Sequence, residues 1–140
     1  MSDPGKLSEY YRTFHRERAK AGTVRAGQRI EFLVRHVGRG KRVLDLGCRY
    51  GDLTQHYLEG NEVVGVDIDA EALAECARRT GIETKVQDLN QALEFPDETF
   101  DVVVLAEVLE HLPYPDLTLG EVRRVLRPGG ILVGSVPNGT

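Results

Sequence analysis

The sequence predicts an α/β fold, an open and doubly wound parallel sheet with helices on both faces. Short apolar runs of strand length alternate with longer runs that repeat apolar residues at helical spacing, which is typical of parallel sheets with right-handed crossovers. The strand-length runs lack the polar–apolar alternation of half-exposed strands, so both of their faces are predicted to be buried. A glycine-containing turn lies directly after the first of these runs.

The 140 residues are predicted to form a single domain (1–140), with amino-terminal helices over residues 1–38 and an α/β core over residues 42–136. Leu7–Ala21 is polar and is predicted to be helical. Val24–Val37 is amphipathic, and its apolar residues recur at a spacing that would turn them toward the sheet. These residues are Ile30, Leu33, Val34 and Val37.

Five apolar runs have the length and composition of strands. The predicted strands are Arg42–Leu46, Glu62–Val66, Glu83–Gln87, Phe100–Leu105 and Ile131–Val136. The fourth is nearly all apolar, so it is predicted to be central. Arg127–Gly130 carries a proline and two glycines and is expected to end the preceding helix sharply before the fifth strand.

Three helices are predicted between these strands. Asp52–Glu59 and Asp69–Thr80 each begin with an aspartate that can cap the helix. Gly81 is expected to end the second helix. The third, Pro115–Leu126, begins with a proline, which is favoured in a first helical turn.

The glycine turn indicates the kind of ligand. Gly47 and Gly51 follow the first strand, and the second strand runs into Asp67, which is placed to bind ribose hydroxyls. A dinucleotide fingerprint that starts at Gly47 requires glycines where this chain has Arg49 and Asp52, and an aspartate there would repel a phosphate. A nucleoside without phosphates, such as S-adenosylmethionine with its cationic sulfonium, avoids both objections.

Five segments, in order, resemble the motifs of class I S-adenosylmethionine-dependent methyltransferases of the small-molecule, type 11/12-like group. The segments are Val43–Gly51, Val63–Asp69, Val86–Asn90, Phe100–Leu112 and Arg127–Asn138. Arg49 departs from the pattern, since it stands where the family has its middle glycine, a position that could accommodate a residue whose side chain points outward. The resemblance implies a Rossmann-like strand order of 3-2-1-4-5-7-6. Because the chain ends at Thr140, we expect the order 3-2-1-4-5 without the usual strands 6 and 7.

The resemblance also implies binding residues for S-adenosyl-L-methionine and its product, S-adenosyl-L-homocysteine. Asp67 would bind the ribose and Ile68 would pack against the adenine. Asp88 would accept a hydrogen bond from the adenine amino group, with the backbone of Leu89 beside the ring. The alternatives are helix capping for Asp67, core packing for Ile68 and a surface loop acid for Asp88.

The remaining cofactor-binding residues belong to the glycine turn and the fourth strand. The resemblance places Asp45 near the amino group of the ligand, and organising the turn is an equally good role for this buried acid. Gly47 and Gly51 would provide the backbone conformation and a close ligand approach, with Cys48 between them in the same set. Leu105 would border the methionine portion through its backbone.

His111 is a candidate general base, because its intrinsic pKa suits proton removal from a nucleophile. Its alternative is a structural histidine in a loop. Glu107 would form part of the pocket wall and belongs to the cofactor-binding set. Tyr10, Tyr11 and Arg25 could fold over the cofactor or bind its carboxylate.

The composition of the chain limits the classes of molecule that are expected to bind it. A net charge of −4 argues against nucleic acid as the main partner, and two cysteines form neither a disulfide framework nor a metal site. No leader or membrane-spanning run is apparent, so we expect a cytoplasmic protein. The resemblance implies a small-molecule substrate. The apolar fifth strand would be an unprotected edge. We therefore expect either part of a longer protein or a minimal domain that forms a homodimer through this edge.

Three functions from different classes remain open at this point. The first is methyl transfer to a small molecule, with oxygen, nitrogen or carbon as the acceptor. The second is a non-catalytic module that binds S-adenosylmethionine or S-adenosylhomocysteine. The third is an NAD-dependent oxidoreductase, which the residues of the glycine turn disfavour.

Overall fold

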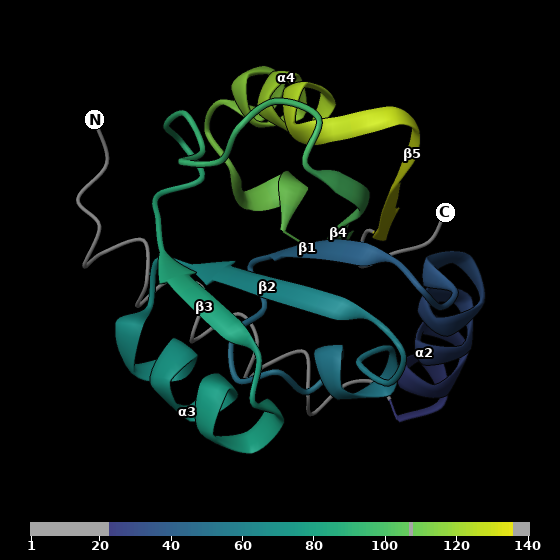
Figure 1. The fold of residues 1–140 in the computed structure, drawn as a ribbon. Helices are drawn as coiled ribbons and strands as arrows, with labels where there is room; N and C mark the ends of the chain where they lie inside the picture. Colours follow the sequence, from purple (N-terminus) through teal and green to yellow (C-terminus); the bar gives the residue numbers. More distant parts are fainter. Residues whose placement is uncertain (1–22, 107, 136–140) are drawn as a thin grey trace.

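A computed structural model of the chain describes residues 23–106 and 108–135. Five parallel strands form one sheet in the order β3-β2-β1-β4-β5 (Figure 1), which confirms the predicted fold class and strand order. The strands are β1 (Arg42–Leu46), β2 (Glu62–Asp67), β3 (Glu83–Val86), β4 (Phe100–Ala106) and β5 (Leu126–Ser135). The predicted helix Leu7–Ala21 lies outside the described residues.

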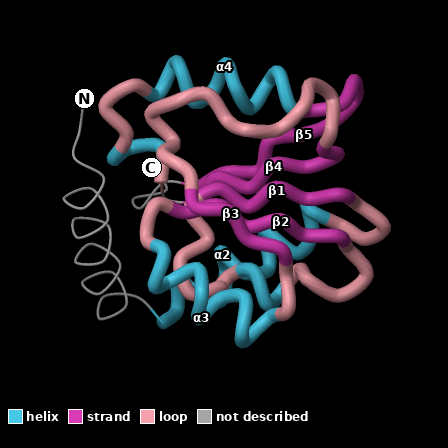
Figure 2. Tube along the Cα trace, turned by 60° about the vertical axis from the view of Figure 1, so that its left-hand side comes forward, coloured by secondary structure: helices cyan, strands magenta, loops and turns pink. Residues whose placement is uncertain are grey.

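Helices cover both faces of the sheet, as a doubly wound fold requires. Helix α4 lies on one face, and α2 and α3 lie on the other (Figure 2). The helices are α2 (Thr23–Val37), α3 (Ala70–Thr80) and α4 (Pro115–Val125), with short 3₁₀ turns η1 (Thr54–His56) and η2 (Leu109–His111).

The hydrophobic core is divided by the sheet into two clusters. Neighbouring residues of one strand enter different clusters, because successive strand side chains point to opposite faces. Leu44 packs in the cluster beneath α4, whereas Val43 packs with Leu33 and Val37 of α2 and with Cys76 of α3. Both faces are therefore apolar, which explains the continuous apolar runs in the sequence.

Helix α2 confirms the predicted amphipathic face only in part. Leu33 and Val37 are buried, as expected for residues four apart on one side of a helix. Val34 was expected to face the sheet as well, but it is 42% exposed. One residue turns a helix by about 100°, so Val34 lies at the margin of the face that Leu33 occupies.

The two predicted caps of helix α3 are confirmed. The side chain of Asp69 accepts a hydrogen bond from the Ala72 amide at 3.1 Å. Gly81 ends the helix in the left-handed conformation, with φ of +76°. The Asp69 cap fixes where the helix begins relative to the carboxyl end of β2, and Gly81 fixes where it ends.

The predicted helix over Asp52–Glu59 is wrong, because only the single 3₁₀ turn η1 forms there. Asp52 makes no cap, and its carboxylate instead pairs with Arg79 at 2.9 Å. The hydroxyls of Thr54 and Tyr57 both donate to the buried Asp45 carboxylate. These contacts draw the segment against β1 and determine its path.

The predicted end of the helix before Arg127–Gly130 is confirmed, since α4 ends at Val125, but this segment lies inside β5 as an irregularity and does not precede the fifth strand. Leu126 already pairs with Phe100, and regular pairing resumes between Ile131 and Val102. The extra residues bulge out of the ladder, and Gly129 takes φ of +83° there. The proline and the two glycines of this segment therefore mark a bulge inside β5.

Candidate functional site

The candidate site lies where the carboxyl ends of β1, β2 and β4 meet. All strands are parallel, so these ends share one edge of the sheet. The chain leaves β1 toward β2 on one side, while β4 pairs on the other side of β1. This change of direction is where open α/β sheets bind ligands. Gly47–Gly51 and Asp67 are both at this edge.

Asp67 is held rigidly at the end of β2. Its side chain is 2% exposed, Oδ2 accepts from the Arg49 amide at 2.9 Å, and Oδ1 accepts from the Asp69 amide at 3.0 Å. Burial raises the pKa of this carboxyl, and the two backbone hydrogen bonds oppose that rise. Each oxygen can accept a further hydrogen bond, so the arrangement suits the predicted ribose contact.

Asp45 organises the segment that follows the glycine turn. Its Oδ2 accepts from the Thr54 hydroxyl at 2.6 Å and also from the Tyr57 hydroxyl. Burial raises the pKa of Asp45 to about 6, although both hydroxyl hydrogen bonds act in the opposite direction. These contacts support the structural alternative for Asp45, and its contact with a ligand amino group stays a prediction.

Both glycines of the turn have the backbone conformation that was predicted for them. Gly47 has φ of +75° and Gly51 has φ of +87°. A Cβ at Gly47 would lie 2.6 Å from Cγ2 of Val108, and one at Gly51 would lie 2.9 Å from Sγ of Cys76. Protein side chains therefore require these glycines, and close approach of a ligand to them stays a prediction.

Arg49 is accommodated in the turn with its side chain buried, not directed outward. Its side chain is 7% exposed, and Nη1 lies 3.0 Å from Oδ2 of Asp69, which is itself buried. The guanidinium also lies over the Tyr50 ring, 5.1 Å from its centroid. Arg49 has φ of +54°, so an arginine occupies a conformation that favours glycine. The acid two residues beyond Asp67 was the available sequence signal for this pairing.

Cys48 turns its side chain into the core beneath the turn. Its thiol donates to the Arg49 carbonyl at 4.0 Å, and the interaction between the Cys48 and Cys76 thiols raises the pKa of Cys48 and lowers that of Cys76. A Cβ at Gly65 would lie 2.7 Å from the Cys48 Sγ. The side chain is thus fully used in packing, and a cofactor contact of Cys48 stays a prediction for its backbone.

The residues predicted to surround an adenine come from the ends of β2 and β3. Ile68 is partly buried and packs against the core cluster beneath α4. Asp88 Oδ1 accepts from the Asn90 amide at 2.9 Å, which shapes the loop after β3. Leu89 is buried, and its carbonyl accepts from the Thr118 hydroxyl of α4 at 2.7 Å.

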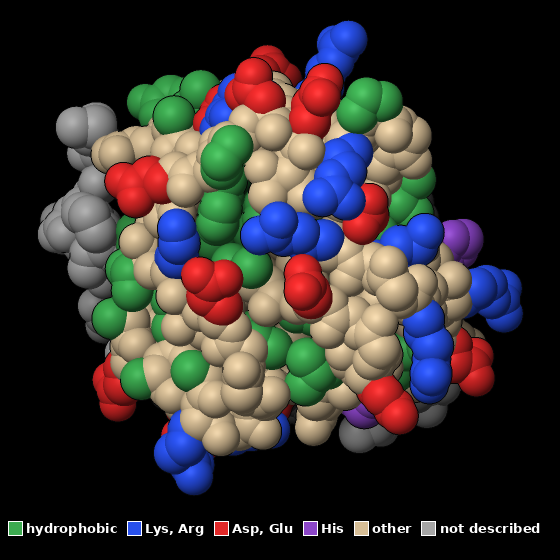
Figure 3. Space-filling model, in the orientation of Figure 1, with side chains coloured by type: hydrophobic (Ala, Val, Ile, Leu, Met, Phe, Trp, Pro, Cys, Tyr) green, Lys and Arg blue, Asp and Glu red, His purple; other side chains and the backbone are tan. Residues whose placement is uncertain are grey.

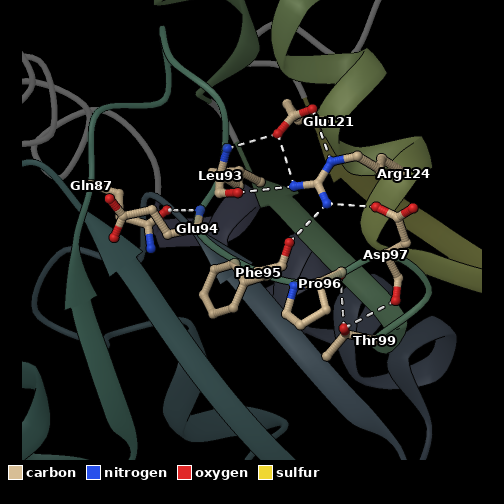
Figure 4. Close-up of polar contacts among 9 residues, drawn as sticks. All are labelled: Gln87, Leu93, Glu94, Phe95, Pro96, Asp97, Thr99, Glu121 and Arg124. Atoms are coloured by element: carbon tan, nitrogen blue, oxygen red, sulfur yellow. Dashed lines mark hydrogen bonds and ion pairs between the residues drawn. The ribbon is translucent and has the colours of Figure 1, made fainter.

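Helix α4 holds the rest of this loop through a network that the sequence did not reveal (Figure 4). The guanidinium of Arg124 donates to the carbonyls of Leu93 and Phe95 at 2.9 and 2.8 Å. Glu121 pairs with Arg124 and accepts from the Leu93 amide at 2.7 Å. The spacing of Glu121 and Arg124 on one helix face was the only sequence signal.

The end of β4 contributes the last group of predicted residues. Leu105 and Ala106 are buried in the strand. His111 lies in η2, and its Nε2 is 3.4 Å from Oε1 of Glu110. The remaining predicted side chains lie outside those that the structure describes: Tyr10, Tyr11, Arg25 and Glu107.

The surface away from this edge of the sheet carries a hollow and a mixture of charges. A hollow of about 710 Å³ lies between α4 and the first half of β5, at the opposite end of the sheet from Asp67. Acidic and basic side chains are interspersed on the face seen in Figure 3. No helix among the described residues is long and apolar enough to cross a membrane. Among residues 23–106 and 108–135, no three His, Cys, Asp or Glu side chains gather as metal ligands would.

Comparison with known proteins identifies the family. Residues 44–134 match the methyltransferase domain family. The ubiquinone biosynthesis O-methyltransferase of Nitrosococcus oceani is 30% identical over 150 residues, which cover 99% of this chain and 64% of that protein. The chain therefore belongs to the methyltransferase domain family, and the predicted resemblance to class I S-adenosylmethionine-dependent methyltransferases is confirmed.

Solved structures agree with this assignment. An S-adenosylmethionine-dependent methyltransferase from Mesorhizobium loti has a TM-score of 0.64 and 29% identity, and the match covers 70% of this chain and 47% of that one. The [4+2]-cyclase SpnF has a TM-score of 0.66 and 27% identity, with 74% of this chain and 42% of that one covered. The chain spans 53% and 64% of the length of the first two curated relatives it matches.

Proposed function

We propose that the chain binds S-adenosylmethionine and takes part in transferring its methyl group to a small-molecule acceptor. The observation that carries this proposal is the buried carboxylate of Asp67, fixed beside the glycine turn at the switch point of the sheet. A carboxylate with spare acceptor capacity fits the neutral vicinal diol of a ribose. A second acid, Asp69, lies beside it, so a phosphate at this point would meet two carboxylates.

The other cofactor contacts follow from the arrangement of the loops. Asp88 would accept from the adenine amino group, and Leu89 would lie beside the ring. Thr118 fixes the Leu89 carbonyl, so this loop is already ordered before a ligand arrives. Leu105 would border the methionine portion through its backbone. Such preorganisation reduces the entropy that binding must overcome.

The bound cofactor supplies an already activated methyl group, so the residues of the chain mainly align the partners and exclude water. A base is needed only when the nucleophile carries a proton. His111 is our candidate for that role, and Glu107 our candidate for the pocket wall. Glu110 Oε1 lies 3.4 Å from His111 Nε2 and would hold the imidazole in position for this role.

The acceptor class is proposed from the relatives. The Nitrosococcus oceani protein is named as an O-methyltransferase of ubiquinone biosynthesis. We therefore propose a small metabolite, with an oxygen acceptor as the first choice and nitrogen or carbon as the others. A hydroxyl acceptor carries a proton, which is the case in which His111 would matter.

A second candidate function is a module that binds S-adenosylmethionine or S-adenosylhomocysteine without methyl transfer. The observation that favours it is the likeness to a [4+2]-cyclase, which indicates that this fold also occurs in proteins other than methyltransferases. The comparisons give no support for an NAD-dependent oxidoreductase.

Calorimetric titration with S-adenosylmethionine, S-adenosylhomocysteine and NAD tests the binding proposal. We expect the two adenosyl ligands to bind and NAD not to bind, and binding of NAD alone would overturn the proposal. Incubation with methyl-labelled cofactor and a panel of phenols, amines and activated carbon acids then separates the two candidate functions. Cofactor binding with no label transfer to any acceptor would favour the binding module.

A homodimer through the free side of β5 is proposed as the assembly. Ile131 and Leu132 are 43% and 41% exposed, and within the described residues β5 pairs only with β4. An apolar edge strand of this kind favours pairing with another strand. Sedimentation over a concentration series would show a dimer, and a monomer at high concentration would exclude it. A cytoplasmic location stays a proposal.

A further inference from the structure

Arg49 brings a buried positive charge to a position where the family has a glycine. Its amide donates to Oδ2 of Asp67 at 2.9 Å, and its Nη1 donates to Oδ2 of Asp69 at 3.0 Å. The residue thus bonds to both acids at the end of β2, one through its backbone and the other through its side chain. A glycine could make the first contact through its own amide, without the strain of an arginine at φ of +54°. Asp69 caps α3 through its other oxygen, Oδ1, so the cap does not depend on the arginine either.

The arginine also carries an unused donor. Its Nε is buried and has no hydrogen-bond partner among the described residues. A guanidinium cannot lose its charge or accept a hydrogen bond, so this N–H can be satisfied only by an acceptor atom. Burying such a group unpaired is unfavourable. Because the amide of the same residue donates to Asp67, an acceptor for this N–H would lie in the same part of the site.

Charge identifies the kind of acceptor. Two buried carboxylates, of Asp67 and Asp69, accept hydrogen bonds from Arg49, the first from its amide and the second from its guanidinium. A phosphate or carboxylate ligand would add a third negative charge in a poorly screened region. A neutral oxygen avoids that repulsion, and a hydroxyl can also donate its own hydrogen to a carboxylate.

We infer that Arg49 is a second ribose-binding residue, whose guanidinium donates a hydrogen bond to the oxygen of a ribose hydroxyl that itself donates to Asp67. This inference rests on the proposed binding of an adenosyl ligand. Arg49 would then help to select ligands with an unmodified ribose. A glycine at this position would offer only its backbone and no such donor.

Calorimetry with S-adenosylhomocysteine and its 2′-deoxy and 3′-deoxy analogues tests this inference without an activity assay. In the wild type, removing the contacted hydroxyl should weaken binding by about tenfold or more, as expected for a hydrogen bond to a charged group. In Arg49→Gly, the parent ligand should bind about tenfold more weakly. We call the loss of affinity between the parent ligand and a deoxy analogue the deoxy penalty. In this variant one of the two deoxy penalties should become smaller, because the protein partner of the corresponding hydroxyl has been removed.

Two further variants control for stability. Arg49→Gly/Asp69→Ser removes both partners of the buried ion pair and keeps a side chain that can cap α3. It should show the same reduced deoxy penalty. Arg79→Ala removes contacts of 3.1 Å and 2.9 Å to Tyr50 O and Asp52 Oδ1, which support the same turn from outside. It should leave both deoxy penalties at the wild-type value.

The outcomes separate the two proposals. If the wild type binds S-adenosylhomocysteine but both deoxy penalties remain unchanged in the Arg49 variants, Arg49 only neutralises Asp69 and the inference is overturned. If the wild type binds neither adenosyl ligand, the proposed function fails and this inference fails with it. A phosphorylated ribose that binds better than the unmodified one would also overturn it.

Discussion

The hydroxyl of Thr118 donates to the carbonyl oxygen of Leu89 at 2.7 Å, and this hydrogen bond joins helix α4 to the loop that follows β3. Both residues are buried. The position of the predicted adenine-binding loop therefore depends on a helix on the same face of the sheet, 29 residues away in sequence. Several consequences of this arrangement can be measured.

Thr118→Val should destabilise the protein and weaken binding of the adenosyl ligand. Valine has a similar shape but leaves the Leu89 carbonyl without its donor, which costs about 1–2 kcal/mol in the free energy of unfolding. Urea denaturation and calorimetry measure the two effects. Thr118→Ser keeps the hydroxyl and should restore the ligand affinity, so equal affinities in both variants would refute a positioning role.

Arg124→Gln should loosen the loop from Leu93 to Asp97, because it removes the donors to two loop carbonyls and an ion pair with Asp97. Hydrogen exchange of the loop amides should become faster while exchange in β1 and β4 is retained. Arg123→Gln changes the neighbouring residue and the same charge, so it is the matched control. Equal exchange in both variants would contradict a specific role for Arg124.

Asp45 should make stability depend on pH in a particular direction. Its pKa is raised to about 6 in the folded protein from 3.8, so between these values the folded state binds more protons than the unfolded state. The contribution of Asp45 to stability is therefore greatest below pH 4 and is lost as the pH rises through 6.

The comparison with Asp45→Asn isolates this effect. The unfolding free energy of the wild type minus that of the variant should increase by about 2 kcal/mol as the pH is lowered from 7 to 4. Urea denaturation at several pH values measures it, and the other carboxyls cancel in the difference. A difference that stays constant with pH would show that the Asp45 pKa is not raised.

Gly47→Ala should lower the free energy of unfolding by more than the same change at another glycine with positive φ. A Cβ at Gly47 would meet Val108 at 2.6 Å, whereas one at Gly40 would meet nothing within 4 Å. Gly40→Ala should cost about 1–2 kcal/mol for the left-handed conformation alone, and Gly47→Ala should exceed it. Equal losses in the urea midpoint of the two variants would show that Val108 moves aside freely.

Asp67→Asn should weaken binding of S-adenosylhomocysteine by about 1–3 kcal/mol, the range for hydrogen bonds to a charged group. Calorimetry measures the affinity, and circular dichroism checks that the variant is folded. Asp52→Asn is the control, because Asp52 lies just beyond the same turn with its carboxylate directed to Arg79. Unchanged affinity in Asp67→Asn would remove Asp67 from the site.

Local patterns in the sequence predicted most of the fold. The strands β1 and β2 and the helix α3, with its caps Asp69 and Gly81, lie where apolar runs and capping residues placed them. The predicted helix at Asp52–Glu59 failed because contacts with Asp45 on β1 determine that segment. Such contacts depend on side chains that meet only in the folded chain.

The same distinction applies to the candidate site. The positions of Gly47, Gly51 and Asp67 followed from spacing, because strand ends and turns are local features. The burial of Arg49 did not, since it depends on Asp69 from the next strand end. The network around Arg124 was equally hidden, because its main partners are backbone carbonyls, which have no sequence signature.

Val108 joins the two sides of the proposed reaction. Its Cγ2 occupies the space beside Gly47, and it lies three residues before His111. A ligand that shifts the segment after β4 must therefore move a methyl group away from the turn that we propose faces the cofactor. Occupancy on the acceptor side would then alter the affinity for the donor, and by thermodynamic linkage the donor would alter the affinity for the acceptor to the same degree.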